Sequence, residues 1–171
     1  MISIVKAAVG DSKLLADIGK VSLLESHGRS APASDMNIYA NKNFNYNAIE
    51  NELREPKNIY HLLYFKQRPA GYSKILFDCP HANIELKNVT KLERLYLLNE
   101  FHGLGLGYRL FEFNLELSKK NNQAGMWLFV WKENQEAVGF YEKAGFKIIG
   151  NYDFIISQNH SNPNHHMFLE F

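Results

Sequence analysis

The chain has 171 residues and a mass of 19.8 kDa, and 19 Lys and Arg residues against 18 Asp and Glu residues leave a formal net charge of +1. That length suits one domain with a single buried core. The near-neutral balance argues against binding to nucleic acid or to an anionic membrane, because such binding rests on a strongly basic surface. Hydrophobic residues make up 46% of the chain, which is too many for intrinsic disorder.

The cysteine content and the first residues bear on the compartment. Cys79 is the one cysteine, so no internal disulfide can form and nothing demands an oxidising compartment. Lys6 and Asp11 interrupt the apolar residues at the start before a signal peptide or a membrane span accumulates. Two formal glycosylation sequons, at Asn88 and Asn159, therefore carry no weight. We expect a cytoplasmic protein.

Hydrophobic periodicity predicts strands and helices in the order of an α/β domain. A helix is expected to follow Asp11 as its N-cap, and residues 67–70 are expected to form the turn of a hairpin. No internal repeat or linker is visible, so one domain over residues 1–171 with a mixed sheet is predicted. One predicted strand starts at residue 2, and the other six cover residues 59–65, 71–77, 92–98, 126–131, 146–156 and 165–171. The other predicted helices cover residues 35–40, 45–54, 106–117 and 134–144.

Asparagine is unusually frequent, and the excess is local. The chain has 18 Asn residues, of which seven lie between Asn37 and Asn58. This segment is too small to bury a core of its own, so it is interpreted as an excursion of the main domain. Glu50, Glu52 and Glu55 lie on one predicted helix there. They are interpreted as a solvated face, and the alternative is that they attract a polycation.

A glycine-rich turn between a strand and a helix is the clearest local pattern. Gly103, Gly105 and Gly107 alternate there, and glycine allows positive φ and close backbone approach. The first N–H groups of the following helix lack intrahelical partners and lie at its positive end, which suits a phosphate. Tyr108 follows Gly107 where a P-loop needs Lys, and Leu110 stands where a dinucleotide-binding loop needs its third Gly. A tight turn that needs glycine for steric reasons alone is the alternative.

A second segment, about 25 residues further along, resembles a motif of the GNAT N-acetyltransferase superfamily. It runs from Trp127 through Asn134, Ala137, Phe140-Tyr141 and Gly145-Phe146, as a strand, an Asn and a helix that carries Ala and Phe-Tyr. The glycine-rich turn resembles the acetyl-CoA pyrophosphate loop of the same superfamily, usually written Gln/Arg-x-x-Gly-x-Gly/Ala. His102, Gly105 and Gly107 fill those places, so His replaces the customary Gln or Arg. Two motifs in the right order are more specific than either alone.

The resemblance covers nearly the whole chain and implies a GNAT fold, with a central, mixed, mostly antiparallel sheet of about seven strands flanked by helices. A looser resemblance to PaiA-type polyamine (spermidine/spermine) N-acetyltransferases implies a small amine acceptor. The segments that carry it are Asp35-Met36 with Tyr39, Phe44-Asn45, Ala70-Gly71-Tyr72 with Lys74, Leu92–Leu97 and Trp127–Trp131.

By the resemblance, the chain forms an amide by direct attack of an amine on the thioester of acetyl-CoA, its cosubstrate. Backbone groups of Leu95, Tyr96 and Leu97 would bind the pantetheine arm and the thioester carbonyl, and an aimed N–H would stabilise the developing negative charge. Asn134 would bind the pantetheine amides, with a helix N-cap as its other reading. The pyrophosphate would be held by main-chain N–H groups of His102, Gly103, Leu104, Gly105, Leu106, Gly107 and Tyr108.

Two residues are predicted to handle protons. Tyr141 lies seven residues after Asn134 and is the predicted general acid for the departing thiolate, with packing beside Phe140 as the alternative. Many relatives place a Glu on the strand before the Asn, but that strand here reads Leu128-Phe-Val-Trp-Lys132. Glu93 is the nearest carboxylate for a general base, and the alternative is a strand residue paired with a Lys.

The remaining predictions concern partners and rival functions. His160, His165 and His166 suggest a metal site, but neighbouring strand residues point to opposite faces and no Cys or Asp completes a set, so no metal is predicted. The alternatives to a small-amine acetyltransferase are an enzyme that acylates a protein N-terminus or lysine, and a non-catalytic acyl-CoA-binding regulatory module. Relatives commonly form homodimers, and the sequence does not decide the oligomeric state.

Overall fold

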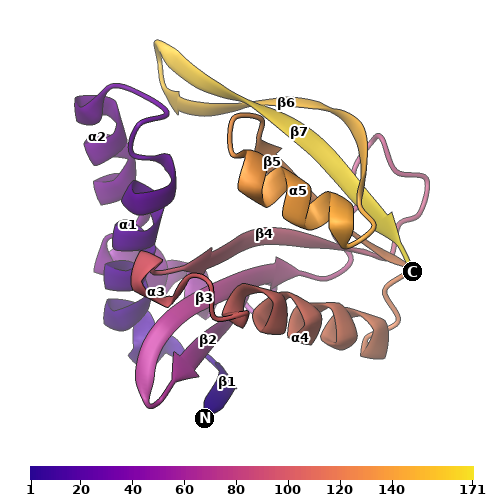
Figure 1. Cartoon of the computed structure of the whole chain (residues 1–171), viewed down its shortest axis with the longest axis horizontal. Coiled ribbons are helices and arrows are strands. Elements are labelled where there is room, and N and C mark those ends of the chain that lie inside the picture. Colours follow the sequence, from indigo (N-terminus) through magenta and orange to yellow (C-terminus); the bar gives the residue numbers. More distant parts are fainter. The chain divides into compact units, whose positions relative to one another are not determined.

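The computed structural model describes all 171 residues, Met1–Phe171, and has the α/β composition that the sequence predicts. Figure 1 labels its elements along the chain. The strands are β1 (Ile2–Lys6), β2 (Ile59–Phe65), β3 (Arg68–Leu76), β4 (Val89–Leu97), β5 (Gly125–Trp131), β6 (Lys147–Ser157) and β7 (His160–Glu170). The helices are α1 (Ser12–His27), α2 (Ala33–Asn43), α3 (Tyr46–Arg54), α4 (Leu106–Lys120) and α5 (Gln135–Lys143), with short 3₁₀ turns η1 (Val9–Asp11) and η2 (Asn99–Phe101).

The seven strands are hydrogen-bonded in the order β1-β2-β3-β4-β5-β7-β6, so the predicted seven-stranded mixed sheet is confirmed. The pairs β1–β2, β2–β3, β5–β7 and β6–β7 are antiparallel, whereas β4 and β5 are parallel. No helix combines the length and the apolar composition that crossing a membrane requires.

Two compact units make up the chain. The first contains Met1–Ile75 and Arg94–Asn114, and the second contains Leu76–Glu93 and Leu115–Phe171. The single domain over residues 1–171 stays a prediction.

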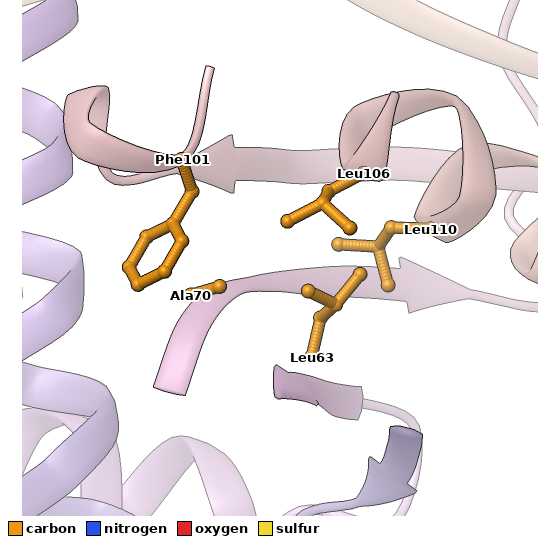
Figure 2. Packing of buried hydrophobic residues seen from close by; sticks show 5 residues of the cluster. All are labelled: Leu63, Ala70, Phe101, Leu106 and Leu110. Atoms are coloured by element: carbon orange, nitrogen blue, oxygen red, sulfur yellow. The ribbon is translucent and has the colours of Figure 1, made fainter. Parts of the chain in front are cut away.

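An apolar cluster in the first unit lies under the start of α4. Leu63 of β2, Ala70 of β3, Phe101 of η2 and Leu106 and Leu110 of α4 are all buried and in contact (Figure 2). Leu106 and Leu110 are four residues apart and therefore lie on one face of the helix. This packing holds the first turns of α4 against β2 and β3, and so determines where the glycine-rich turn lies.

A buried amide joins the same helix to β3. Asn114 is fully buried, and its Nδ2 donates to the Ser73 hydroxyl at 2.9 Å and to the Leu110 carbonyl at 2.7 Å. A buried amide is costly unless its hydrogen bonds are made, so the bond to Ser73 favours one register of α4 along β3, while the bond to Leu110 lies within the helix.

The turn between β2 and β3 differs from the prediction. The strands meet at Lys66 and Gln67, both with positive φ (49° and 64°), and β3 begins at Arg68. The predicted turn over residues 67–70 was therefore placed too late. Neither turn residue is Gly, Asn or Asp, so the usual signal for a tight hairpin turn is missing from the sequence.

In the second unit, β6 and β7 form a long antiparallel hairpin (Figure 1). Its neighbour β5 contributes Trp127 and Trp131, which are both buried. The Trp127 indole N–H donates to the Cys79 carbonyl at 2.7 Å, and its ring packs with Ile84 and Val89. The segment before β4 is thereby held on the sheet.

The acidic helix α3 is not simply a solvated face, which corrects the interpretation of Glu52. Its carboxylate lies 2.8 Å from the Lys74 ammonium and 3.4 Å from the Arg94 guanidinium, and it accepts a hydrogen bond from the Tyr60 hydroxyl. Its side chain is 27% exposed, whereas those of Lys74 and Arg94 are 7% and 13% exposed. Glu50 instead pairs with Arg54 on the same helix, at the surface.

Burial and neighbouring charges shift the pKa of Glu52 in opposite directions. Burial raises the pKa of its carboxyl, but the Arg94 charge and the donors Lys74 and Tyr60 outweigh burial and hold the pKa below its ordinary value. A carboxyl whose pKa is lower in the folded than in the unfolded protein stabilises the fold at any pH above the unfolded pKa. That contribution is lost as the pH falls through the folded pKa. The interaction therefore favours folding at neutral pH and weakens in acid.

The cluster of Figure 2 predicts the effect of truncating Leu110. Leu110→Ala should lower the free energy of unfolding by about 2–5 kcal/mol, because it removes buried contacts and leaves a cavity. Urea denaturation followed by circular dichroism measures the change. Leu104→Ala is the matched control, since Leu104 is 52% exposed and should cost less than about 0.5 kcal/mol. Equal losses of stability in both variants would contradict the burial of Leu110 in this cluster.

The ion cluster predicts a pH-dependent effect of Glu52→Gln. At pH 7 this variant should lose about 2 kcal/mol, because the amide leaves the cations Lys74 and Arg94 without a carboxylate. The difference from wild type should narrow as the pH is lowered below about 4.3, where the unfolded carboxyl also takes up a proton. Urea unfolding between pH 3 and pH 7 measures both effects.

Glu50→Gln is the control for Glu52→Gln. The Glu50–Arg54 pair is exposed, with side chains 36% and 61% accessible, and should contribute less than about 0.5 kcal/mol at any pH. A Glu52→Gln variant that matches Glu50→Gln at pH 7 would show that the cluster does not stabilise the fold.

Candidate functional site

The glycine-rich turn has the backbone conformation for which glycine is needed. Gly103 and Gly105 have φ of +76° and +71°, and no atom lies within 4 Å of a Cβ added at either position. The requirement at both is therefore conformational and not steric. Gly107 differs, because α4 begins at Leu106 and a Cβ at Gly107 would make an ordinary 3.5 Å contact with Leu97.

The glycine-rich turn is exposed to solvent, whereas the helix that follows it is held by the buried side chains of Leu106 and Leu110. Leu104 and Tyr108 are about half exposed, and His102, Gly103 and Gly105 are exposed as well. The first N–H groups of α4 have no carbonyl one turn earlier in the helix, and the helix dipole places partial positive charge at this end. The turn therefore offers main-chain donors to an anion from the solvent side.

The end of β4 places three predicted backbone contacts between two layers of side chains. Leu95 and Leu97 pack against the cluster of Figure 2. The Tyr96 ring stacks on Tyr72 with centroids 5.9 Å apart, and meets the His27 ring edge to face at 6.0 Å. Burial raises the pKa of Tyr96 to about 12, so its phenol stays neutral at physiological pH. Side chains therefore pack on both faces of this strand.

A close backbone approach at Gly71 is a feature that the sequence interpretation did not single out. A Cβ at Gly71 would lie 2.3 Å from the Tyr96 carbonyl oxygen and 3.1 Å from the Leu97 Cα. Only glycine allows β3 and the end of β4 to lie so close here. The preceding residue on β3, Ala70, accepts a hydrogen bond through its carbonyl from the Leu98 N–H at 2.9 Å.

His102 has a contact of its own with β4. Its Nε2 lies 3.3 Å from the Leu97 carbonyl oxygen. Its backbone N–H donates to the Asn99 carbonyl at 3.0 Å, which closes the short turn η2. In the first unit the structure thus brings together the end of β4, His102 and the glycine-rich turn.

The second unit carries the other predicted site residues. Asn134 precedes α5, and its Oδ1 accepts a hydrogen bond from the Ala137 N–H at 3.2 Å. The N-cap reading of Asn134 is therefore confirmed, and its contact with a ligand stays a prediction. Tyr141 follows seven residues later, about two helical turns, so both residues lie on the same side of the helix axis.

Tyr141 is largely buried and is held among aromatic rings. Its side chain is 9% exposed, and Phe140 and Phe146 meet its ring edge to face at 5.3 and 5.5 Å. The Phe146 N–H also donates to the Tyr141 carbonyl at 3.0 Å. The packing anticipated from the sequence is present. It restricts the directions that the phenol can take.

Glu93 lies on β4 beside a lysine, as one reading of the sequence predicts. The Lys91 Nζ is 3.3 Å from the Glu93 carboxylate, and the same ammonium lies over the Trp127 and Phe129 rings at 5.1 and 5.6 Å. Both side chains are about a quarter exposed. Glu93 therefore has a lysine partner on its own strand.

The histidines fall in different surroundings. His166 is fully buried, with its ring 4.2 Å from that of His81 and among Trp127 and Phe129. Burial, and then the neighbouring His81 and Lys91, lowers the pKa of His166 to about 4. No three His, Cys, Asp or Glu side chains of the chain come together as a group that could hold a metal ion.

Comparison with known proteins gives a consistent result. The sequence profile of the acetyltransferase (GNAT) family matches residues 22–146. A Lactobacillus delbrueckii subsp. lactis protein named as an N-acetyltransferase is 26% identical over 158 residues, which cover 92% of this chain and 91% of that protein.

Solved structures show the same fold. The PaiA N-acetyltransferase of Thermoplasma acidophilum, in complex with coenzyme A, superposes with a TM-score of 0.79 at 19% identity, over 100% of this chain and 99% of that one. The ribosomal-protein-S18-alanine N-acetyltransferase of Escherichia coli gives a TM-score of 0.72 at 15% identity, over 99% and 94% of the two chains. The family profile covers well over half of the sequence, and the chain therefore belongs to the acetyltransferase (GNAT) family.

Proposed function

We propose that this N-acetyltransferase transfers the acetyl group of acetyl-CoA to a primary amine, and that the amine is a small, polyamine-like molecule. The observation that carries the proposal is the exposed turn with positive φ at Gly103 and Gly105, directly before the open N-terminus of α4. The PaiA structure that shares this fold contains coenzyme A.

The chain's own groups suit an anion held without a basic patch. Main-chain N–H groups between His102 and Tyr108 would bind the pyrophosphate at the positive end of α4. A net charge of +1 accords with this, because backbone donors and the helix dipole supply the positive potential. Because Gly103 and Gly105 have no side chains, the pyrophosphate can come close to the backbone of the turn.

Backbone groups at the end of β4 would act on the thioester. Leu95, Tyr96 and Leu97 are held by packing on both faces of the strand, so their N–H and carbonyl groups are fixed in direction. A fixed N–H aimed at the thioester oxygen stabilises the negative charge that develops as the amine attacks. Asn134 has amide hydrogens left after capping α5 and can donate one to a pantetheine carbonyl.

Tyr141 is the proposed general acid. The thiolate that leaves must take up a proton, and a phenol of pKa ~10 can give one to a thiolate whose acid has a pKa near 8.5. The transfer is uphill by about 2 kcal/mol on these reference values, so the phenol must be within hydrogen-bond reach of the sulfur. Confinement by Phe140 and Phe146 limits the motion that would lose this geometry.

The amine must lose a proton before it attacks. A primary amine with a pKa near 10.4 is about 3.4 units above neutral pH, which corresponds to roughly 4.6 kcal/mol. Glu93 is the proposed base, directly or through water. Its side chain is 27% exposed, so water can reach the carboxylate and carry the proton to it.

A second candidate function is acetylation of a protein N-terminus or lysine. The ribosomal-protein-S18-alanine N-acetyltransferase shares the fold over nearly its whole length, so the fold by itself fits both kinds of acceptor. The sequence segments similar to PaiA-type enzymes favour the small amine. The acceptor therefore has to be identified by turnover.

Replacing the phenol tests the role of Tyr141. Tyr141→Phe should lower kcat by about 10²- to 10⁴-fold, because general acid catalysis contributes a factor of that size. The Kd for acetyl-CoA should change little, since the aromatic ring stays in place. CoA release followed with a thiol reagent from pH 6 to pH 10 measures kcat. Full activity of Tyr141→Phe across that range would show that the residue is not the acid.

Tyr152→Phe is the matched control for Tyr141→Phe. Tyr152 is an exposed tyrosine on β6 that stacks on Phe129. Removal of its hydroxyl should leave kcat within about twofold of wild type, because the ring and its stacking on Phe129 are kept. Equal losses in the two variants would point to a general effect on the fold.

An acceptor panel tests the proposed function itself. We expect CoA release with spermidine and related small diamines at a kcat/KM at least about tenfold above that for peptides with a free N-terminus or lysine, a preference of about 1.4 kcal/mol. The reverse order would support the protein-acetylating alternative. Tight binding of acetyl-CoA without turnover of any amine would contradict the enzymatic proposal.

A further inference from the structure

The segment that joins β4 to the glycine-rich turn is tied at almost every residue. The Leu98 N–H donates to Ala70 of β3 at 2.9 Å, and the Phe101 N–H donates to the Leu98 carbonyl at 2.9 Å. The Asn99 N–H donates to the carboxylate of Glu25, from α1, at 2.8 Å. Phe101 itself is buried in the cluster of Figure 2. Residues 98–101 therefore form a rigid corner.

His102 closes this corner with its side chain. A carbonyl oxygen can only accept, so the ring nitrogen Nε2, 3.3 Å from the Leu97 oxygen, must carry the hydrogen and donate it. The bond spans five residues and joins the last residue of β4 to the residue before Gly103. It connects the strand that holds Leu95–Leu97 to the turn that begins at Gly103.

The Leu97 peptide is constrained from a second side by β3. The absence of a side chain at Gly71 brings β3 to within contact of the Tyr96 carbonyl and of Leu97. The backbone of Leu97 thus lies between Gly71 and the imidazole of His102. A peptide group held from both sides keeps its orientation when a ligand binds. Less conformational entropy is then lost on binding.

We propose that His102 is a positioning residue, whose imidazole holds the Leu97 carbonyl and couples the strand Leu95–Leu97 to the turn Gly103–Tyr108. The inference rests on the proposed function, in which both segments bind acetyl-CoA. His102 acts through the backbone of Leu97 and needs no contact of its side chain with the cosubstrate. Its effect is therefore expected on cosubstrate affinity and not on the chemical step.

Two substitutions at position 102 separate the hydrogen bond from the bulk of the side chain. His102→Phe keeps a ring but has no donor, whereas His102→Gln keeps an N–H that can reach the same carbonyl. In His102→Phe the Kd for CoA and the KM for acetyl-CoA should rise about 3- to 10-fold, the factor expected for one neutral hydrogen bond. Both constants should stay within about twofold of wild type in His102→Gln, and kcat at saturation within about twofold in both variants.

Isothermal titration calorimetry with CoA and steady-state kinetics give these constants. His160→Phe is the control, because it removes a comparable histidine hydrogen bond, from Nε2 to Asn162 Oδ1 at 3.0 Å, at the β6–β7 turn. It should leave the Kd and the KM unchanged. A Kd of His102→Phe equal to that of wild type would overturn the inference, as would a fall in kcat without a change in KM.

A measurement without cosubstrate keeps the inference separate from the proposed function. The ¹⁵N shifts of the His102 ring in the free protein should show a hydrogen on Nε2, and the Nδ1–H tautomer would refute the hydrogen bond directly. Wild-type protein that binds no CoA in calorimetry would instead refute the proposed function and leave the tautomer result standing.

Discussion

One carboxylate, that of Glu52, is needed to satisfy the polar side chains that three neighbouring strands direct toward α3. Tyr60 comes from β2, Lys74 from β3 and Arg94 from β4, and all three donate to it. Two nearly buried cations would be costly without an anion beside them, so the packing of α3 on these strands depends on this residue. Arg94 also lies over the Phe44 ring at 4.7 Å. These contacts hold Arg94 in place, directly before Leu95–Leu97 on the same strand.

Features that depend on neighbouring residues in the chain could be predicted from the sequence. Asn134 caps α5, Gly103 and Gly105 adopt positive φ, and Leu106 and Leu110 form a buried stripe. Each follows from the conformational preference of one residue type or from helical spacing. The seven strands were predicted for a similar reason, because apolar alternation is a local pattern. The family motifs then placed the glycine-rich turn at the candidate site.

Features that depend on long-range partners could not be predicted. Glu52 shares the short helix α3 with Glu50, and nothing local distinguishes the two. Its burial follows from strands that come later in the chain. The Leu97–His102 bond and the approach of Gly71 to Tyr96 require the path of the backbone in space. Asp11 is a local exception, because it was predicted as the N-cap of α1 but its carboxylate accepts a hydrogen bond from the Ala8 N–H, three residues earlier in the chain.

The asparagine excess and the acidic helix can be interpreted together. The amides of Asn43, Asn45 and Asn58 donate to backbone carbonyls within this segment, including that of Glu52, so part of the excess closes the ends of short helices. The carboxylates of Glu50 and Glu52 pair with cations of the protein itself. A polyamine could use Glu52 only by displacing Lys74 or Arg94, whose charges lie within 3.4 Å and are shielded from solvent. Recognition of a cationic acceptor must therefore depend on groups other than these two carboxylates of α3.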